Sequence, residues 1–167
     1  MILIAYDGSQ DAKSAVEHAG NLMPGHPAIV LTVWEPYMQI LARSTAPFGM
    51  MGGVENVGEI DDAARNSAET RAAEGAALAH SCGIDASPRT VAREDSIAET
   101  ILAEADRTNA GAIVVGSRGL GGLSSLFLGS VSHAVLQHAD RPVVIVPSPE
   151  VAQRRNERRR QLDAAPA

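Results

Sequence analysis

The chain has 167 residues, of which 45% are hydrophobic and 20% are charged. This length suits one domain with its own hydrophobic core, and the composition excludes a chain that is disordered throughout. No apolar run approaches the ~18 residues of a membrane span, and the single cysteine, Cys82, excludes an internal disulfide.

The charge is distributed unevenly along the chain. Residues 1–150 carry 9 basic and 18 acidic side chains, whereas residues 151–167 carry five arginines and two acids. An acidic body binds nucleic acid poorly, because phosphates must be neutralised by Lys and Arg, and five aromatic residues cannot furnish a platform for base stacking. Met1 leads directly into an apolar segment with no charged leader, so we expect a cytoplasmic protein.

The first half of the chain alternates between strand and helix patterns. Met1–Tyr6 is a short apolar run that predicts a buried strand. Ser9–Met23 has helical spacing of its apolar residues, with Ser9 as N-cap, and Ala28–Trp34 predicts a second buried strand. Glu35–Gly58 is rich in Gly, Pro and Met without a clear period, so we expect a long mobile loop.

The second half continues the alternation. Helices are predicted at Ile60–His80, Ser96–Arg107 and Ser130–His138, and strands at Ala86–Ala92 (an edge strand), Gly111–Val115 and Val143–Val146. Strands that alternate with helices predict an α/β fold, in which one open parallel sheet has helices on both faces. We therefore expect a single domain over residues 1–148 and an Arg-rich tail over residues 149–167 that is flexible or forms a short frayed helix.

A glycine- and serine-rich segment, GSRGLGGLSSLFLGS, occupies residues 116–130. Glycine lets backbone N–H groups approach an anion closely, and a helix beginning at Ser130 would add unpaired N–H groups and partial positive charge. The segment is no Walker A loop, since Lys13 is the chain's only lysine, and it does not follow the first strand as a dinucleotide-binding turn would. A plain flexible loop is the alternative.

Four residues of this segment, Gly116, Gly119, Gly129 and Ser130, have the spacing G-x2-G-x9-G-[ST]. This pattern resembles the nucleotide-binding members of the universal stress protein family. Asp7-Gly8-Ser9, Val30–Pro36 and Arg141–Pro147 resemble three further stretches of that family, so the resemblance covers about residues 1–148. It implies a Rossmann-like sheet of five parallel strands in the order 3-2-1-4-5.

The resemblance also implies that the ligand is ATP, with Mg²⁺ held through the phosphates. It implies that Asp7 faces the adenosine, that the backbone of Val33 binds the adenine, that Gly116 and Gly119 pass close to ribose and phosphates, and that Gly129, Ser130 and Val131 hold phosphate oxygens. An Asp at position 7 has a structural alternative, since it can cap a helix or close an Asx turn. Thr32 and Ala12 depart from the family, in which His and Ser are common at these positions.

The implied function is a stress-response sensor or regulator with little or no catalysis. No residue is placed to orient an attacking water and no Walker lysine is present, although weak ATP hydrolysis stays open. An interaction module of the same fold that binds no nucleotide is the competing hypothesis. A nucleotidyl transferase is disfavoured because its HxGH-like signature is missing.

Other chemistry finds little support in the sequence. The five histidines lack metal-ligand spacing, and a hydrolase triad of Ser117, His133 and Asp7 lacks the G-x-S-x-G elbow. Pro142–Val146 is apolar, and the strand order implied by the resemblance places it at a sheet edge. An uncovered edge invites pairing, so we expect a homodimer formed through this strand.

Overall fold

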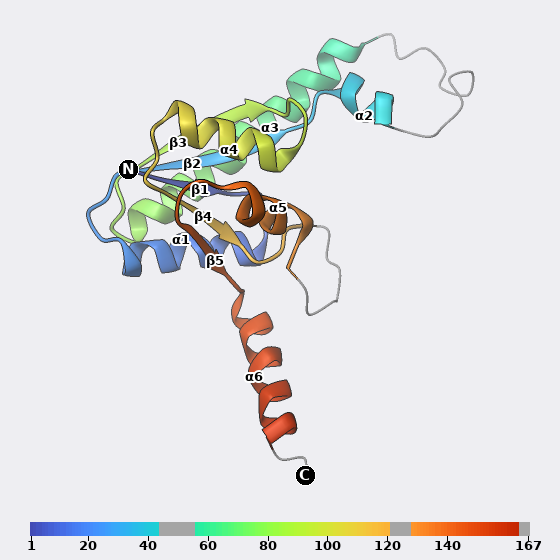
Figure 1. The fold of residues 1–167 in the computed structure, drawn as a ribbon. Helices are drawn as coiled ribbons and strands as arrows, with labels where there is room; N and C mark the ends of the chain where they lie inside the picture. The colour runs from blue at the N-terminus through green and yellow to red at the C-terminus, as the bar shows by residue number, and fades with distance from the viewer. Residues whose placement is uncertain (44–55, 121–127, 164–167) are drawn as a thin grey trace.

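The computed structural model describes residues 1–43, 56–120 and 128–163. Its parallel sheet has the order β3-β2-β1-β4-β5, which confirms the predicted topology (Figure 1). The strands are β1 (Ile2–Ala5), β2 (Ala28–Trp34), β3 (Ala86–Ala92), β4 (Ala112–Gly116) and β5 (Val143–Val146). In the register, Ile4 of β1 stands between Val30 of β2 and Val114 of β4.

Helices cover both faces of the sheet. They are α1 (Gln10–Leu22), α2 (Tyr37–Arg43), α3 (Val57–Ser81), α4 (Ile97–Arg107), α5 (Ser130–His138) and α6 (Pro149–Asp163). One core cluster packs α1 and α3 against the sheet, and a second packs α4 and α5 against the other face. Ile4 belongs to the first cluster and Leu3 to the second, and both are fully buried. Burial on both faces explains why the central strands are apolar throughout rather than alternating.

Serine side chains cap two of the helices, one at Ser9 as the sequence predicts and one at Ser96. The Ser9 hydroxyl accepts the N–H of Ala12 at 3.2 Å, and the Ser96 hydroxyl accepts the N–H of Glu99 at 3.0 Å. These bonds satisfy donors that the first turn of a helix otherwise leaves unpaired. The N-termini of α1 and α4 are therefore closed by their own chain.

The segment after β2 differs from the expected loop. Residues 37–43 form α2, and α3 begins at Val57, three residues before the predicted start. The backbone N–H of Tyr37 donates to Asp61 of α3 at 2.7 Å, and the Gln39 side chain donates to the carbonyl of Arg93 at 2.8 Å. α2 buries no side chain of its own and is held by contacts with distant residues. Its sequence therefore has no periodic apolar pattern that would predict a helix. Residues 44–55 of the expected loop lie outside the described residues.

β5 lies at the edge of the sheet as predicted. The Arg-rich tail takes the helical one of its two expected forms, as residues 149–163 form α6, a helix of 15 residues. Figure 1 shows this helix leaving the end of β5 and pointing away from the rest of the protein. None of the helices in the described part of the chain combines the length and apolarity needed to cross a membrane.

Candidate functional site

The turn after β1 is built around the carboxylate of Asp7. Its Oδ1 atom accepts the backbone N–H of Ser9 at 2.9 Å, which closes an Asx turn, and Gly8 has a φ of +83°, which favours glycine. Its Oδ2 atom accepts the backbone N–H of Leu120 at 3.0 Å. Asp7 therefore forms the structural turn that the sequence allowed, and it also ties that turn to the segment that follows β4.

The end of β2 leaves backbone groups without a strand beside them. β1 and β2 pair only as far as Ala5 and Leu31, while β2 continues along β3 to Trp34. The carbonyl of Leu31 accepts from Tyr6 on the β1 side, and that of Trp34 accepts from Arg93 on the β3 side. Because successive residues of a parallel strand bond to alternate sides, the N–H and C=O of Val33 point to the β1 side, beyond the end of β1.

Gly116 ends β4 directly against α1. A Cβ at this position would lie 2.7 Å from the carbonyl carbon of Asp11 and 2.9 Å from the nitrogen of Ala12. Both atoms are helix backbone and cannot move aside cheaply. The structure thus supplies a packing reason for glycine here, in addition to the ligand approach that the family resemblance implies.

Gly119 lies against the carboxylate of Asp7. A Cβ at position 119 would stand 2.6 Å from Asp7 Oδ2, the atom that binds the Leu120 N–H. Neither Gly119 nor Gly129 has a positive φ. The demand for glycine at these two positions therefore comes from close approach and not from backbone strain.

The N-terminus of α5 is open, unlike those of α1 and α4. Gly129 is its N-cap, with φ of −62° and ψ of 152°, and offers no side chain to the first turn. Two hydrogen bonds fix the start of α5 against the end of β4. The Gly129 N–H donates to the Ser117 carbonyl at 2.8 Å, and the Ser132 hydroxyl donates to the Gly116 carbonyl at 2.7 Å. Within the part of the chain that the structure describes, no N-cap side chain bonds the first N–H groups of α5, and the helix dipole favours an anion there.

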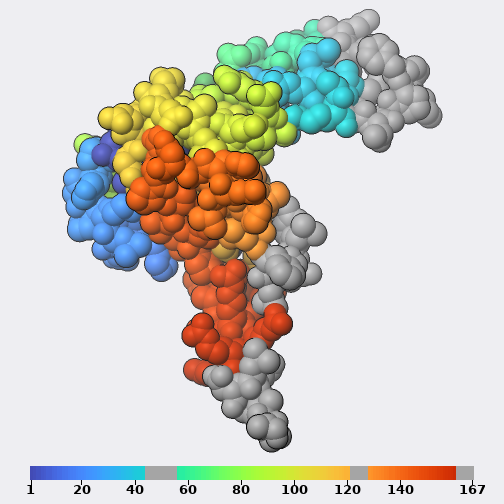
Figure 2. Space-filling model, viewed as in Figure 1, coloured from blue at the N-terminus to red at the C-terminus, as the bar shows by residue number. Residues whose placement is uncertain are grey.

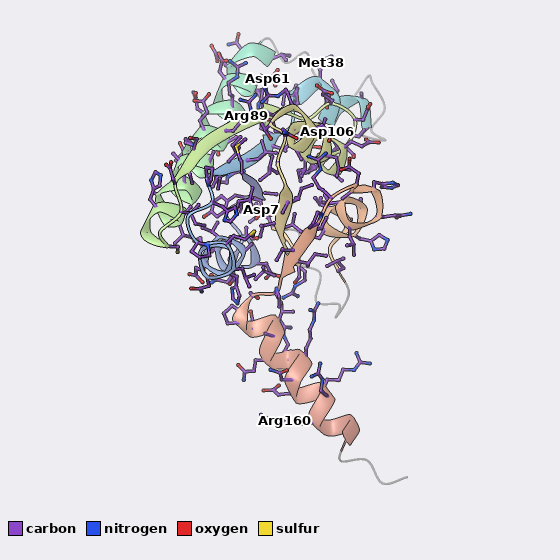
Figure 3. The ribbon with its side chains drawn as sticks, turned by 60° about the vertical axis from the view of Figure 1, so that its left-hand side comes forward. Asp7, Met38, Asp61, Arg89, Asp106 and Arg160 are labelled. Carbon is purple, nitrogen blue, oxygen red and sulfur yellow. The ribbon has the colours of Figure 1, made fainter. Side chains whose placement is uncertain are left out.

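These features surround one cavity of about 600 Å³ at the carboxyl edge of the sheet. Its volume is within the range of small-molecule sites. All seven residues predicted from the sequence line it: Asp7, Val33, Gly116, Gly119, Gly129, Ser130 and Val131. In Figure 3, Asp7 lies within the body of the protein, far from Arg160 at the end of α6.

The cavity also has walls that the sequence did not single out. Trp34 and Arg71 line it, together with Ile97 and Ile101 of α4. The Arg65 guanidinium lies 5.4 Å from the centre of the Trp34 ring, within reach of a cation–π contact. A second cavity of about 440 Å³ lies beside the first and shares Asp7 and Arg71 with it. Trp34 reaches this edge as the last residue of β2, whereas only the packing of α3 against the sheet brings Arg71 there.

A buried ionic cluster supports the wall after β4. Asp11 is 5% exposed, its Oδ2 atom accepts the Ser117 hydroxyl at 2.7 Å, and Arg118 Nε lies 3.9 Å from the same atom. Arg118 lines the cavity, where its positive charge would favour an anion. Burial raises the pKa of the Tyr6 phenol, helped by the nearby carboxylates of Glu74 and Asp7, so Tyr6 lines the cavity as a neutral group.

No group of three His, Cys, Asp or Glu side chains suited to a metal ion occurs among residues 1–43, 56–120 and 128–163. Ser117, the serine of the disfavoured triad, is fully buried and donates its hydroxyl to Asp11.

Comparison with known proteins places this geometry in context. The sequence pattern of the universal stress protein family matches residues 1–147. A curated relative, a universal stress protein from Thermus aquaticus, is 35% identical over 153 residues, which cover 87% of this chain and 96% of the relative. The solved structure of a universal stress protein from Archaeoglobus fulgidus is 23% identical, covers 87% of this chain and 96% of its own, and has a TM-score of 0.65.

Other solved structures of this fold hold adenylate ligands. One is a universal stress protein in complex with cAMP (21% identical, 88% of this chain and 95% of that chain, TM-score 0.59). Another is the Archaeoglobus fulgidus protein in complex with dAMP, which is 20% identical, covers 87% of this chain and 95% of its own, and has a TM-score of 0.55. A family protein from Arabidopsis thaliana has AMP bound; it is 18% identical, covers 87% of this chain and 90% of its own, and has a TM-score of 0.54. At these identities the likeness shows a shared fold.

Proposed function

The chain belongs to the universal stress protein family, and from that premise we propose that the cavity at the carboxyl ends of β1, β2 and β4 binds an adenine nucleotide. The observation that carries the proposal is the meeting, around one cavity, of the free backbone edge at Val33 and the open N-terminus of α5. The first suits the edge of a base and the second suits phosphate.

Each part of the nucleotide has a place in this proposal. The backbone of Val33 binds the adenine, and Asp7 lies next to the ribose. Gly119 lets the chain pass close to the phosphates, while Ser130 and the N–H of Val131 hold phosphate oxygens. The proposed ligand is ATP, with Mg²⁺ held through the phosphates. Bound cAMP, dAMP and AMP in proteins of the same fold support an adenine nucleotide.

We propose a regulatory rather than a catalytic role in the stress response. No lysine lines the cavity, and its described acidic residues are Asp7, which already accepts two backbone N–H groups, and Glu35, which pairs with Arg43 and Arg93. Neither carboxylate is free to orient an attacking water, so we expect slow hydrolysis at most. The competing hypothesis, an interaction module that binds no nucleotide, does not explain why the N-terminus of α5 lacks a capping side chain.

The assembly and location that we propose are a cytoplasmic homodimer. β5 is an edge strand, and its Pro142–Val146 segment would pair with the same segment of a second copy across a two-fold axis.

Ligand analysis and calorimetry test the proposed function. Mass spectrometry of the small molecules released from purified protein identifies a copurified nucleotide. Titration of ATP, with and without Mg²⁺, then measures affinity in ligand-free protein. Ser130→Ala should weaken ATP binding about 10- to 150-fold, the value of one hydrogen bond to a charged group. The control Ser87→Ala changes an exposed serine of β3 outside the cavity and should have no effect.

Two results would contradict the proposal. One is wild-type protein, freed of ligand, that binds no adenine nucleotide at millimolar concentration with Mg²⁺ present. The other is Ser130→Ala protein with the ATP affinity of the Ser87→Ala control, which would remove the Ser130 hydroxyl from the site.

A further inference from the structure

The C-terminal helix α6 lies beyond residues 1–147, the part of the chain that matches the family. Figure 2 shows it projecting from the body of the protein, and Arg160 is far from the body in Figure 3. The proposed nucleotide site makes no use of this helix, since residues 149–163 contribute nothing to the lining of the cavity. Neither the family fold nor the proposed nucleotide site therefore explains the presence of α6.

Among residues 148–160, the buried side chains lie at the start of α6. Val151 is 4% exposed and Ser148 is 2% exposed. The Ser148 carbonyl accepts the N–H of Ala152 at 2.9 Å, and its hydroxyl accepts that of Val151 at 3.4 Å. Farther along, Arg154 and residues 156–160 are exposed. The helix is thus fixed to the body at one end and presents the remainder to its surroundings.

The arginines of α6 form a basic face. At about 100° per residue, Arg154, Arg155, Arg158 and Arg159 lie within an arc of about 140°. Val151 is on the same side of the helix, so the basic face continues the side that meets the body. Arg160 points about 170° away from the centre of this face. Arg154 pairs with Glu150 at 3.3 Å, and this exposed pair contributes little.

A partner for this face must be acidic and must belong to another molecule. Residues 1–150 carry 18 acidic and 9 basic side chains, so the body of the protein is strongly acidic. At ~1.5 Å per residue, Arg154–Arg160 lie about 8–17 Å along the helix from Pro149. Figures 1 and 2 show α6 pointing away from the body, so the exposed arginines at its far end, residues 158–160, do not dock on the acidic body of their own chain.

We propose that the basic face of α6 docks on the acidic body of a second copy of this chain. Every molecule carries both complementary surfaces, which steers copies together. Only two residues separate α6 from β5, whose outer edge has no neighbouring strand in the described sheet. A second copy at that edge would lie beside the helix.

Other polyanions fit less well. The acidic body repels nucleic acid at the range where association begins, since phosphates must be approached by net positive charge. A helix that lies in a membrane surface needs an apolar face, and residues 153–160 contain no apolar side chain. The arginines alone would suit any polyanion, but the acidic charge of the body favours a second copy of this chain over nucleic acid.

Sedimentation equilibrium of the full chain, without nucleotide, tests the proposal at 50 and 500 mM NaCl. We expect self-association that weakens at the higher salt concentration. Arg154→Glu with Arg158→Glu should raise the dissociation constant roughly 2- to 30-fold at low salt, as expected for two exposed ion pairs. Arg158→Glu and Arg160→Glu are matched single variants, because each changes the net charge equally on the same helix. Only the first lies on the basic face, so only it should weaken association.

Several outcomes would overturn the proposal. These are a monomer at all concentrations up to 100 µM, an association that salt and Arg158→Glu leave unchanged, and equal effects of Arg158→Glu and Arg160→Glu, which would indicate net charge alone. Titrations with a DNA duplex and with vesicles of anionic phospholipid complete the test. If either binds more tightly than the second copy at 150 mM NaCl, and Arg158→Glu abolishes that binding, the partner of α6 is that polyanion instead.

Discussion

Replacement of Gly116 by alanine should destabilise the protein through the contact between β4 and α1. The added Cβ would lie 2.7 Å and 2.9 Å from backbone atoms of Asp11 and Ala12, closer than packed side chains approach. Forced overpacking of this kind costs about 1–3 kcal/mol. For a chain of this length, such a loss should lower the melting temperature by about 2–12 °C.

Gly111→Ala is the matched control for this measurement. It makes the same chemical change just before β4, but its Cβ would meet only the carbonyl oxygen of Met1, at 3.8 Å. Its melting temperature should stay within about 4 °C of wild type, since the loss of glycine entropy contributes at most ~1 kcal/mol. Thermal unfolding followed by circular dichroism measures both variants. Equal melting temperatures would refute the packing explanation, and Gly116→Ala protein that is stable but binds no ATP would assign the glycine to ligand approach.

Three further predictions address the turn, the core and the C-terminal helix. Asp7→Ala should weaken adenosine binding while leaving inorganic phosphate affinity nearly unchanged; calorimetric titrations that show equal losses for both ligands would contradict the ribose assignment. Burial raises the pKa of Glu104 above its ordinary value of 4.5, although Glu104 pairs with Arg89 and Arg107. Protonated Glu104 therefore stabilises the fold at low pH, and this contribution is lost as the pH rises through the raised pKa. Glu104→Gln should accordingly flatten the decline of unfolding free energy above pH 4.5, as measured by urea titrations; an unchanged slope would show that Glu104 titrates normally. Truncation after Ala152 should leave the melting temperature unchanged, whereas truncation after Pro147 should lower it by about 3–12 °C, because the second removes buried Val151; equal melting temperatures would show that α6 has no anchor.

The sequence by itself determined the order of elements and much of their extent. Ala86–Ala92, Val143–Val146 and Ser130–His138 have the bounds that the apolar runs and their flanking turn residues predict. Ser9 caps a helix as expected. These features depend on neighbours within a few residues, so local periodicity and hydrogen-bonding chemistry are sufficient to find them. The seven predicted residues around the cavity were found in a different way, from the spacing of the family resemblance.

Tertiary structure alone decided how distant segments meet. Asp7 and Leu120 are 113 residues apart, yet a hydrogen bond joins them because β1 and β4 are neighbours in the sheet. Arg71 lines the cavity because α3 packs over β2, and contacts with Asp61 and Arg93 hold α2 in place. The need for glycine at position 116 likewise comes from the approach of α1. None of these contacts leaves a periodic signal, since each depends on the path of the chain in space and not on the residues next to it in sequence.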